Sequence, residues 1–402
     1  MSPQEPNPQR RRVLLGSTGL LAAPWLAMAQ PAQAHSQAQT DPTTAQNPSP
    51  SAAPAPTLRP RALVFPRDHG THNDTRTEWW YLTGHAQDAA GRAFGFQVTF
   101  FRSRVDGTHT LPGRLAARQL LFAHAAITDV QAGQLWHDQR IARWNGEPPA
   151  SGLPTERGVF ASTQDTHVVL RDWSIQRQPN GAYATRIQSD PLRIDLRATP
   201  TQPLLLQGDN GFSRKGPDPA QASFYVTQPQ LAVQGQLALG SQRFQVQGTA
   251  WLDHEWSEAL LHPAAVGWDW IGMNLFNGDS LTAFRLRRPD GSALWAGGSW
   301  RSAAAPTANS FAPNEVEFTP LRHWTSPRTR ARYPVEWRVS TPGATGTMVY
   351  TVKAVIDPQE LDSSASTGTV YWEGLSDLLN SQGQPVGRGY LEMTGYAQRL
   401  VL

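Results

Sequence analysis

Residues 271–284 read IGMNLFNGDSLTAF, and this stretch decides the fold. Large apolar side chains alternate with small or polar ones over 271–275, Asn277-Gly278 follows, and a second apolar run starts at Leu281. Asn-Gly readily adopts the positive φ angles that a tight turn between two strands requires. The stretch therefore predicts an antiparallel β-hairpin.

The same pattern recurs along the chain. Apolar residues occupy every second position over 94–100, and Gly240-Ser241 separates two further alternating segments. The 33 glycines and 33 prolines suit a chain of many strands and turns, and no long amphipathic helix pattern is present. At 402 residues, we expect an all-β protein made of two antiparallel β-barrels or sandwiches.

The first residues have the order of an export signal. Three arginines at 10–12 precede an apolar stretch at 13–26, and small-residue cleavage sites follow at 27–29 and 32–34. The adjacent arginines favour the twin-arginine route over the Sec route. We expect a periplasmic or secreted protein whose mature chain begins near Gln30 or His35. The predicted organisation is a signal peptide at 1–34, a disordered linker at 35–60, an N-terminal β domain at 61–247 and a C-terminal β domain at 248–402.

Composition excludes several classes of partner. The formal net charge is +3 and no basic block appears in the folded part, so nucleic acid is not an expected partner. The chain contains no cysteine, which excludes disulfide bonds and a thiol-linked lipid anchor.

The stretch 251–256, WLDHEW, places two acids and a histidine among tryptophans. Alternate residues of a strand share a face. His254 therefore shares one face with Trp256, while Asp253 and Glu255 share the other. A carboxyl or imidazole group that loses solvent among indoles has a shifted pKa, which makes its proton available for chemistry.

Asp269, in the segment GWDW at 267–270, falls on the same face as Ile271 and Met273. Burying a charge on an apolar face is costly unless the charge is paired. Asp269 is therefore expected to stay protonated and to act as a proton donor. The structural alternative is that it pairs with an arginine or anchors a turn.

Two further features have a structural interpretation. Glu78 falls opposite Arg102 if the chain forms a hairpin about Gly91, which predicts a cross-strand ion pair. The segment Asp68-His69-Gly70-Thr71-His72 carries two histidines in a glycine-containing loop that specifies no third ligand. We therefore expect no bound metal.

Eight short segments form a signature that is specific as a set. They are Asp68-His69-Gly70, Glu78-Trp79-Trp80-Tyr81, Phe100-Phe101-Arg102, Gly208–Ser213, Asp253-His254-Glu255-Trp256, Gly267-Trp268-Asp269-Trp270, Tyr371-Trp372-Glu373-Gly374 and Gly389–Tyr396. This set resembles the AttH-like family, which is grouped with carotenoid 1,2-hydratases and often described as predicted secreted hydrolases. The resemblance spans nearly all of the chain beyond the linker. It implies two lipocalin-like β-barrel domains with a cleft between them.

The resemblance to the hydratases also implies a reaction. These enzymes add water to a terminal carbon–carbon double bond without a cofactor, by protonating the alkene. The family's His-x-Trp matches His254 and Trp256, and its following aspartate matches Asp269, so these three are the expected catalytic residues. The family's tyrosine two positions before that aspartate is Gly267 here. The expected ligand-binding residues are Trp79, Tyr81, Trp251, Trp268 and Trp270.

Three functions fit these expectations. The first is a cofactor-free hydro-lyase or hydrolase acting on an apolar, isoprenoid or lipid-like ligand in the cleft, with transient membrane contact. The second is a non-catalytic periplasmic carrier of hydrophobic ligands. The third is a glycoside-active hydrolase that uses Asp253 and Glu255. An unpaired Asp269 near His254 favours catalysis, and an arginine-neutralised Asp269 favours the carrier.

Overall fold

Antiparallel β-strands form nearly all the regular structure in the computed structural model, which describes residues 58–113, 115–148, 158–259, 261–305, 307–343 and 346–400. Within these ranges the helical structure is one short 3-10 segment, η1 (Arg67–His69). No helix described there is long and apolar enough to cross a membrane. The predicted signal peptide and the predicted linker up to residue 57 lie outside the described residues. The predicted all-β class is confirmed.

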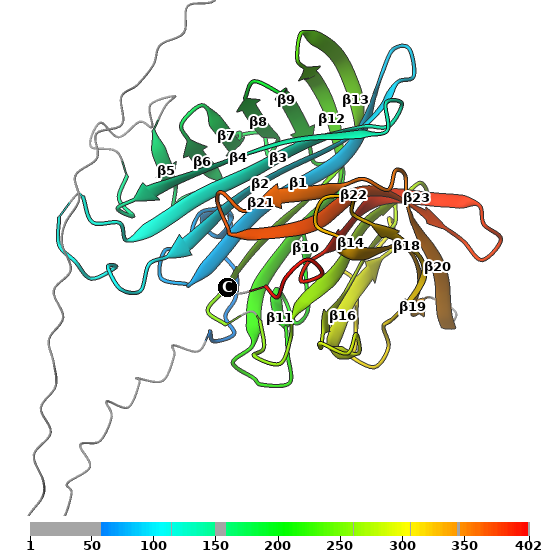
Figure 1. Cartoon of the computed structure of the whole chain (residues 1–402). Helices are drawn as coiled ribbons and strands as arrows, with labels where there is room; N and C mark the ends of the chain where they lie inside the picture. Colours follow the sequence, from blue (N-terminus) through cyan, green and yellow to red (C-terminus); the bar gives the residue numbers. More distant parts are fainter. Residues whose placement is uncertain are drawn as a thin grey trace, which may run out of the picture. The chain divides into compact units, whose positions relative to one another are not determined.

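Thirteen strands form the first sheet, in the order β4-β3-β2-β1-β13-β12-β9-β8-β7-β6-β5, with β10 and β11 paired to β12. Strand β4 returns to contact β5, β6 and β9, so the sheet curls into a nearly closed barrel (Figure 1). The strands are β1 (Thr77–Asp88), β2 (Ala93–Arg104), β3 (Gln119–Asp129), β4 (Gln134–Trp144), β5 (Val159–Ala161), β6 (His167–Leu170), β7 (Trp173–Arg177), β8 (Tyr183–Gln188), β9 (Leu192–Thr199), β10 (Leu205–Leu206), β11 (Phe212–Arg214), β12 (Ala222–Leu239) and β13 (Gln242–Ser257).

The inward face of the first sheet carries the predicted alternation. Phe94, Phe96, Val98 and Phe100 on β2 are all fully buried in its core. Burial of apolar area is the main favourable term in folding, at roughly 25 cal/mol per Å². This periodicity fixes which face of each strand looks into the barrel, and therefore which face is left for a neighbouring layer.

Ten strands form the second sheet, in the order β17-β16-β15-β14-β23-β22-β20-β19-β18, with β21 paired to β22. Its core includes Ile271, Met273 and Leu281. The strands are β14 (Gly267–Leu275), β15 (Ser280–Arg287), β16 (Ala293–Arg301), β17 (Asn309–Phe311), β18 (Glu317–Thr325), β19 (Arg332–Gly343), β20 (Gly346–Ala354), β21 (Glu360–Ser363), β22 (Thr369–Leu379) and β23 (Pro385–Met393).

The hairpin predicted from residues 271–284 is confirmed. Strands β14 and β15 pair about Asn277-Gly278, with Ile271 opposite Ala283. Gly278 has a φ of +90°, a conformation that glycine adopts without steric cost. The turn sets the register of the whole pair, so it also decides which residues face each other at the far end of β14.

The chain passes from the first sheet to the second after Ser257. Strand β13 runs through Gly248 and pairs with both β1 and β12 on either side of it. The second sheet begins with β14 at Gly267. The sheets therefore divide between Ser257 and Gly267, whereas the sequence suggested Gly248. The tryptophan-rich stretch 251–256 is the end of the last strand of the first sheet.

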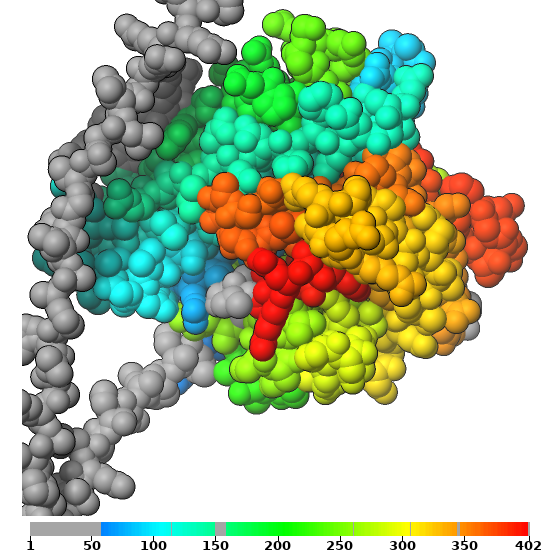
Figure 2. All heavy atoms as spheres, in the orientation of Figure 1, coloured from blue at the N-terminus to red at the C-terminus, as the bar shows by residue number. Residues whose placement is uncertain are grey.

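The two sheets pack against each other. Strand β1 contacts β23, β13 contacts β14, and β2 contacts β22. Segments of the first sheet, cyan to green, meet the yellow-to-red segments of the second in the space-filling view (Figure 2). Aromatic side chains fill much of this junction, and they include Tyr81, Trp251, Trp270, Phe284 and Tyr390.

Candidate active site

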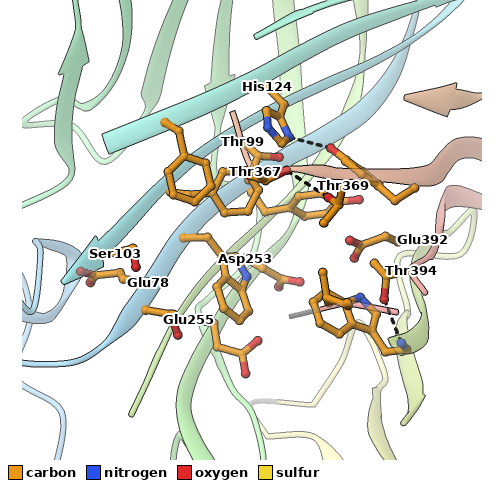
Figure 3. A pocket seen from close by; sticks show the side chains of 18 of the residues that line it. Glu78, Thr99, Ser103, His124, Asp253, Glu255, Thr367, Thr369, Glu392 and Thr394 are labelled. Atoms are coloured by element: carbon orange, nitrogen blue, oxygen red, sulfur yellow. Dashed lines mark hydrogen bonds between the residues drawn. The ribbon is translucent and has the colours of Figure 1, made fainter. Parts of the chain in front are cut away.

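A cavity of about 310 Å³ lies between the two sheets, and side chains of both line it (Figure 3). We call it the inter-sheet cavity. This volume falls at the lower end of the range of small-molecule sites. Its wall is rich in aromatic rings, which include Trp79, Tyr81, Phe101, Phe122, Trp268, Trp270, Phe284 and Tyr371.

Strand alternation explains which residues reach the cavity. Asp253 and Glu255 line it, whereas His254 and Trp256 on the opposite face of β13 do not. On β14 the same rule brings Trp268 and Trp270 to the cavity and turns Asp269 away.

Asp253 is buried and held by two hydroxyl groups. Tyr225 donates a hydrogen bond to Oδ2 at 2.7 Å, and Thr227 donates one to Oδ1 at 2.6 Å. Trp270 in turn donates its indole N–H to the Tyr225 hydroxyl at 3.1 Å. Burial raises the pKa of Asp253 to about 7, although the hydrogen bonds from Thr227 and Tyr225 oppose the rise. This carboxyl therefore exchanges its proton near neutral pH.

Glu373 and Glu392 lie directly opposite each other on β22 and β23 and both line the cavity. Burial and the charge of Glu392 raise the pKa of Glu373 well above its usual value. Burial also raises the pKa of Glu392 to about 7, and Glu255 and Asp253 add to that rise. Two carboxyl groups in such proximity do not ionise together at neutral pH, so one of them holds a proton.

The two cations that line the cavity are already paired. Lys215 Nζ lies 2.9 Å from Glu255 Oε1, and Arg102 Nε lies 2.9 Å from Glu78 Oε2. Within the described ranges, no ion pair joins a cation to the remaining three acids of the cavity, Asp253, Glu373 and Glu392. The cavity thus has more acids than bases.

Replacing Glu392 by glutamine should stabilise the fold at pH 8 and lose this advantage near pH 5. Burial raises the pKa of Glu392 from 4.5 to about 7, so between these values the folded protein keeps a proton that the unfolded chain has lost. The contribution of Glu392 to the free energy of unfolding is therefore fully present below the pKa of the unfolded chain. It is lost as the pH rises through about 7, by at most about 1.4 kcal/mol per pH unit. Urea unfolding at pH 5 and pH 8 measures the difference.

The exposed variant Glu317→Gln is the control, because it tests whether loss of a surface charge alone reproduces the effect. Equal pH slopes for the wild type and Glu392→Gln would show that Glu392 titrates alike in the folded and unfolded chains.

Of the two environments expected for Asp269, the structure has the arginine-paired one. Its carboxylate is fully buried, and Arg285 Nε donates to Oδ2 at 2.7 Å while Arg287 donates to Oδ1 at 2.8 Å. The Tyr396 hydroxyl donates a third hydrogen bond at 2.9 Å. Asp269 is not among the residues that line the cavity. The arginine pair of the structural alternative is therefore present, and the Asp269 carboxylate lies outside the cavity.

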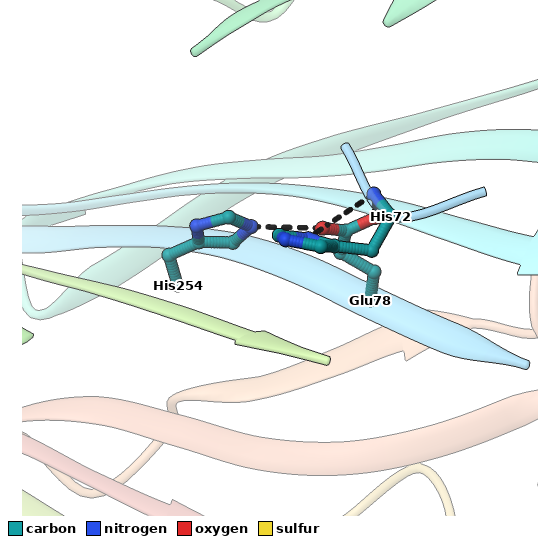
Figure 4. Close-up of side chains that lie close together, drawn as sticks. All are labelled: His72, Glu78 and His254. Atoms are coloured by element: carbon teal, nitrogen blue, oxygen red, sulfur yellow. Dashed lines mark hydrogen bonds and ion pairs between the residues drawn. The ribbon is translucent and has the colours of Figure 1, made fainter. Parts of the chain in front are cut away.

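His254 belongs to a different network, behind the cavity wall. Its Nε2 lies 2.9 Å from Glu78 Oε1, and His72 Nδ1 lies 2.8 Å from the same oxygen (Figure 4). Burial lowers the pKa of His254, although Glu78 opposes the shift. Trp256 stacks on the His72 ring, with centroids 3.8 Å apart. His254 and Trp256 are thus brought together, but within the described ranges no hydrogen bond joins either to Asp269.

His72, Glu78 and His254 offer three ligand atoms within 4.8 Å of one another, a spacing that could hold a metal ion. Both histidines hydrogen-bond to Oε1 of Glu78, and Arg102 donates to its Oε2. The Nδ1 atom of His254 is buried without a hydrogen-bond partner among the described residues. The Glu78–Arg102 pair that the sequence predicted is confirmed, with the two residues opposite each other on β1 and β2.

Four of the five predicted ligand-binding residues line the cavity. They are Trp79, Tyr81, Trp268 and Trp270. Trp251 does not line it, but its ring packs edge-on against Trp270 at a centroid distance of 6.4 Å. Trp251 therefore supports the cavity wall from behind.

The residues that sequence reasoning did not select are Glu373, Glu392, Lys215 and Tyr225. Glu373 alternates with Tyr371 on one face of β22, and both line the cavity, which is the same aromatic–acid pattern as on β13. That pattern could have nominated Glu373. Lys215 follows β11 and reaches Glu255 on β13, and no local pattern indicates this contact.

Comparisons with known proteins agree with this architecture. The AttH-like family model matches residues 56–396. A crystal structure from Nitrosomonas europaea, described as an AttH, has 44% identity and a TM-score of 0.74, and the match covers 85% of this chain and 99% of that one. Kievitone hydratase from Nectria haematococca matches with 14% identity and a TM-score of 0.62, over 86% of this chain and 94% of that one, which shows a shared fold. No curated protein matches the sequence. From the extent of the family match, this chain belongs to the AttH-like family.

Proposed function

We propose that the inter-sheet cavity binds an apolar alkene and that its carboxyl groups catalyse the addition of water to the double bond. The observation that carries this proposal is the set of three cavity acids without a cationic partner in the described chain, Asp253, Glu373 and Glu392. A protonated carboxylic acid among aromatic rings is a proton donor matched to neutral pH. One protein of the same fold is named a hydratase, which is compatible with the proposal but does not carry it.

The reaction needs one acid and one base. Burial and the charge of Glu392 raise the pKa of Glu373 and favour its protonated form, so Glu373 is the proposed acid: its O–H bond breaks, a C–H bond forms, and the alkene becomes a carbocation. Water then forms a C–O bond with the cation and passes a proton to a carboxylate, Asp253 or Glu392. When Glu392 takes the proton, transfer to the facing Glu373 returns the acid to its starting state; when Asp253 takes it, Asp253 releases that proton to solvent water and Glu373 regains one from solvent. The balance is alkene plus water giving an alcohol.

The reaction also requires that the carbocation be stabilised, and the aromatic wall does this. Trp79, Trp268 and Trp270 contribute rings to the cavity. Each ring face stabilises a nearby cation by roughly 0.5–2 kcal/mol. These rings also limit the water that reaches the cation, so that the carboxyl groups decide where the proton goes.

The test uses alkenes with a terminal isopropylidene group, offered as a panel in oxygen-18 water. We expect at least one tertiary alcohol product that carries oxygen-18, detected by mass spectrometry, and incorporation of one deuterium when the reaction runs in D2O. Ligand binding by the protein without label in any product would contradict the hydratase proposal.

That outcome would favour a second candidate, a carrier of apolar ligands. The arginine-neutralised Asp269 is the observation that supports it, because the residue predicted as the acid is engaged in the core of the second sheet. The largely aromatic wall is better suited to an apolar ligand, as both of these functions require, than to a polysaccharide substrate. For both we propose that the protein works in the periplasm or outside the cell, since the arginine–apolar–small-residue order at the start of the chain is that of an export signal.

A further inference from the structure

The inter-sheet cavity contains a buried carboxyl oxygen whose hydrogen bonding is incomplete. Glu373 is 2% exposed, lines the cavity, and its Oε1 makes no hydrogen bond of normal geometry among the described residues, although the Tyr81 and Tyr371 hydroxyls interact with its carboxyl group. An unpaired buried acceptor costs about 1–3 kcal/mol relative to a satisfied one. A cationic ligand beside this oxygen favours the ionised carboxylate and is attracted to it, which a neutral glutamine amide would not reproduce.

The cavity wall also shows how this protein holds an ammonium group of its own. Lys215 Nζ lies 4.4 Å from the ring centroid of Tyr225 and 4.4 Å from that of Phe284, beside the carboxylate of Glu255. Two ring faces and one carboxylate are therefore sufficient here to keep a cation buried.

The cavity wall contains a second set of carboxyl groups and aromatic rings. Asp253, Glu373 and Glu392 supply carboxyl groups, and Trp268 and Trp270 supply indole rings. Within the described part of the chain, no lysine or arginine pairs with these three acids. The arrangement resembles the Lys215 site with its ammonium group removed.

We infer that the inter-sheet cavity selects apolar organic cations, that is, tertiary or quaternary ammonium groups with hydrocarbon substituents. The hydrocarbon part contacts the aromatic wall, and the charged nitrogen lies beside Glu373 and its neighbouring acids. Small inorganic ions need oxygen ligands on several sides, which the aromatic part of the wall does not supply.

This inference rests on the proposed function, in which the same cavity binds an apolar ligand. It deepens that proposal because the carbocation formed on protonation of an alkene has the charge and shape of such an ammonium group. Enzymes bind the charge distribution of the transition state more tightly than that of the substrate. An ammonium compound is then expected to occupy the site better than a neutral molecule of equal shape.

The test compares benzyltrimethylammonium with its neutral isostere neopentylbenzene, in which carbon replaces nitrogen. Tryptophan fluorescence at pH 8 follows binding of each probe to the wild type. We expect the cation to bind at least tenfold more tightly, and Glu373→Gln to reduce this preference several-fold while affinity for neopentylbenzene stays within twofold. Asp195→Asn, an exposed change on β9, is the matched control and should leave the preference unchanged.

Glu392→Gln is the second variant, for use if Glu373→Gln does not fold, and it should reduce the preference in the same direction. Equal affinities of the wild type for both probes would overturn the inference, as would a preference that neither glutamine variant alters. The oxygen-18 experiment keeps the two proposals apart. Label incorporation without cation preference would remove this inference alone, and cation preference without label in any product would remove the hydratase proposal alone.

Discussion

Glu373→Gln should lower the rate of water addition by about 100-fold or more while the protein stays folded. The amide has nearly the shape of the protonated carboxyl group but delivers no proton to a carbon atom. Burial and the charge of Glu392 raise the pKa of Glu373, which favours its neutral form in the unliganded protein. Replacing it by a neutral group therefore costs little stability. Initial rates of oxygen-18 incorporation and a thermal melt measure the two effects.

The matched comparison is Glu392→Gln, which changes the facing acid in the same way. It should reduce the rate less if Asp253 accepts the proton from water, and as much if Glu392 does. Asp195→Asn, outside the cavity, should leave the rate unchanged. A Glu373→Gln protein that incorporates label at the wild-type rate would show that Glu373 is not the acid.

Asp269→Asn should destabilise the fold by about 3–5 kcal/mol, because it leaves two buried guanidinium groups without their countercharge. The loss exceeds that of an ordinary hydrogen bond, since Arg285 and Arg287 both lie against a fully buried carboxylate. Urea unfolding at pH 7 measures it.

Asp377→Asn provides the matched control for Asp269→Asn. Asp377 pairs with Arg388 at 2.6 Å in the same sheet, but both side chains keep more than a quarter of their surface exposed. Its loss should cost no more than about 1 kcal/mol. If Asp269→Asn instead abolished activity with unchanged stability, Asp269 would have the catalytic role that the sequence suggested.

Much of the fold was predictable, because period-two alternation and Asn-Gly turns are local signals. The hairpin about Asn277-Gly278 is one example, and the alternation over 94–100 is another. The hairpin register also predicts the partner of Asp269. Residues paired across that turn place Asp269 directly opposite Arg285, as the structure shows. The Asp269–Arg285 ion pair could therefore have been predicted from the Asn277-Gly278 turn.

The predicted site residues lie on strands that border the cavity, but some of them are on faces turned away from it. Trp268 and Trp270 were chosen as ligand-binding residues and do line the cavity, whereas Asp269 between them points into the second sheet. Alternation groups residues by face, but it does not say which face of a strand lies against a second layer. Asp253 and Glu255 could not be preferred to His254 until the packing of the two sheets was known.

The long-range contacts had no local signal at all. Lys215 meets Glu255 through a loop that follows β11, and His124 Nδ1 on β3 lies 2.8 Å from the Tyr371 hydroxyl on β22. These pairs depend on how the sheets are assembled. The sequence of one protein contains no local pattern that relates positions so far apart along the chain.

The division of the cavity wall between two sheets has an evolutionary consequence. Tyr225 and Asp253 come from the first sheet, and Trp270 and Glu392 come from the second. A substitution that enlarges a side chain on one wall must be met by a smaller one on the other, or the cavity closes. Related sequences should therefore show correlated changes between these facing positions, while the outward faces of the two sheets diverge independently.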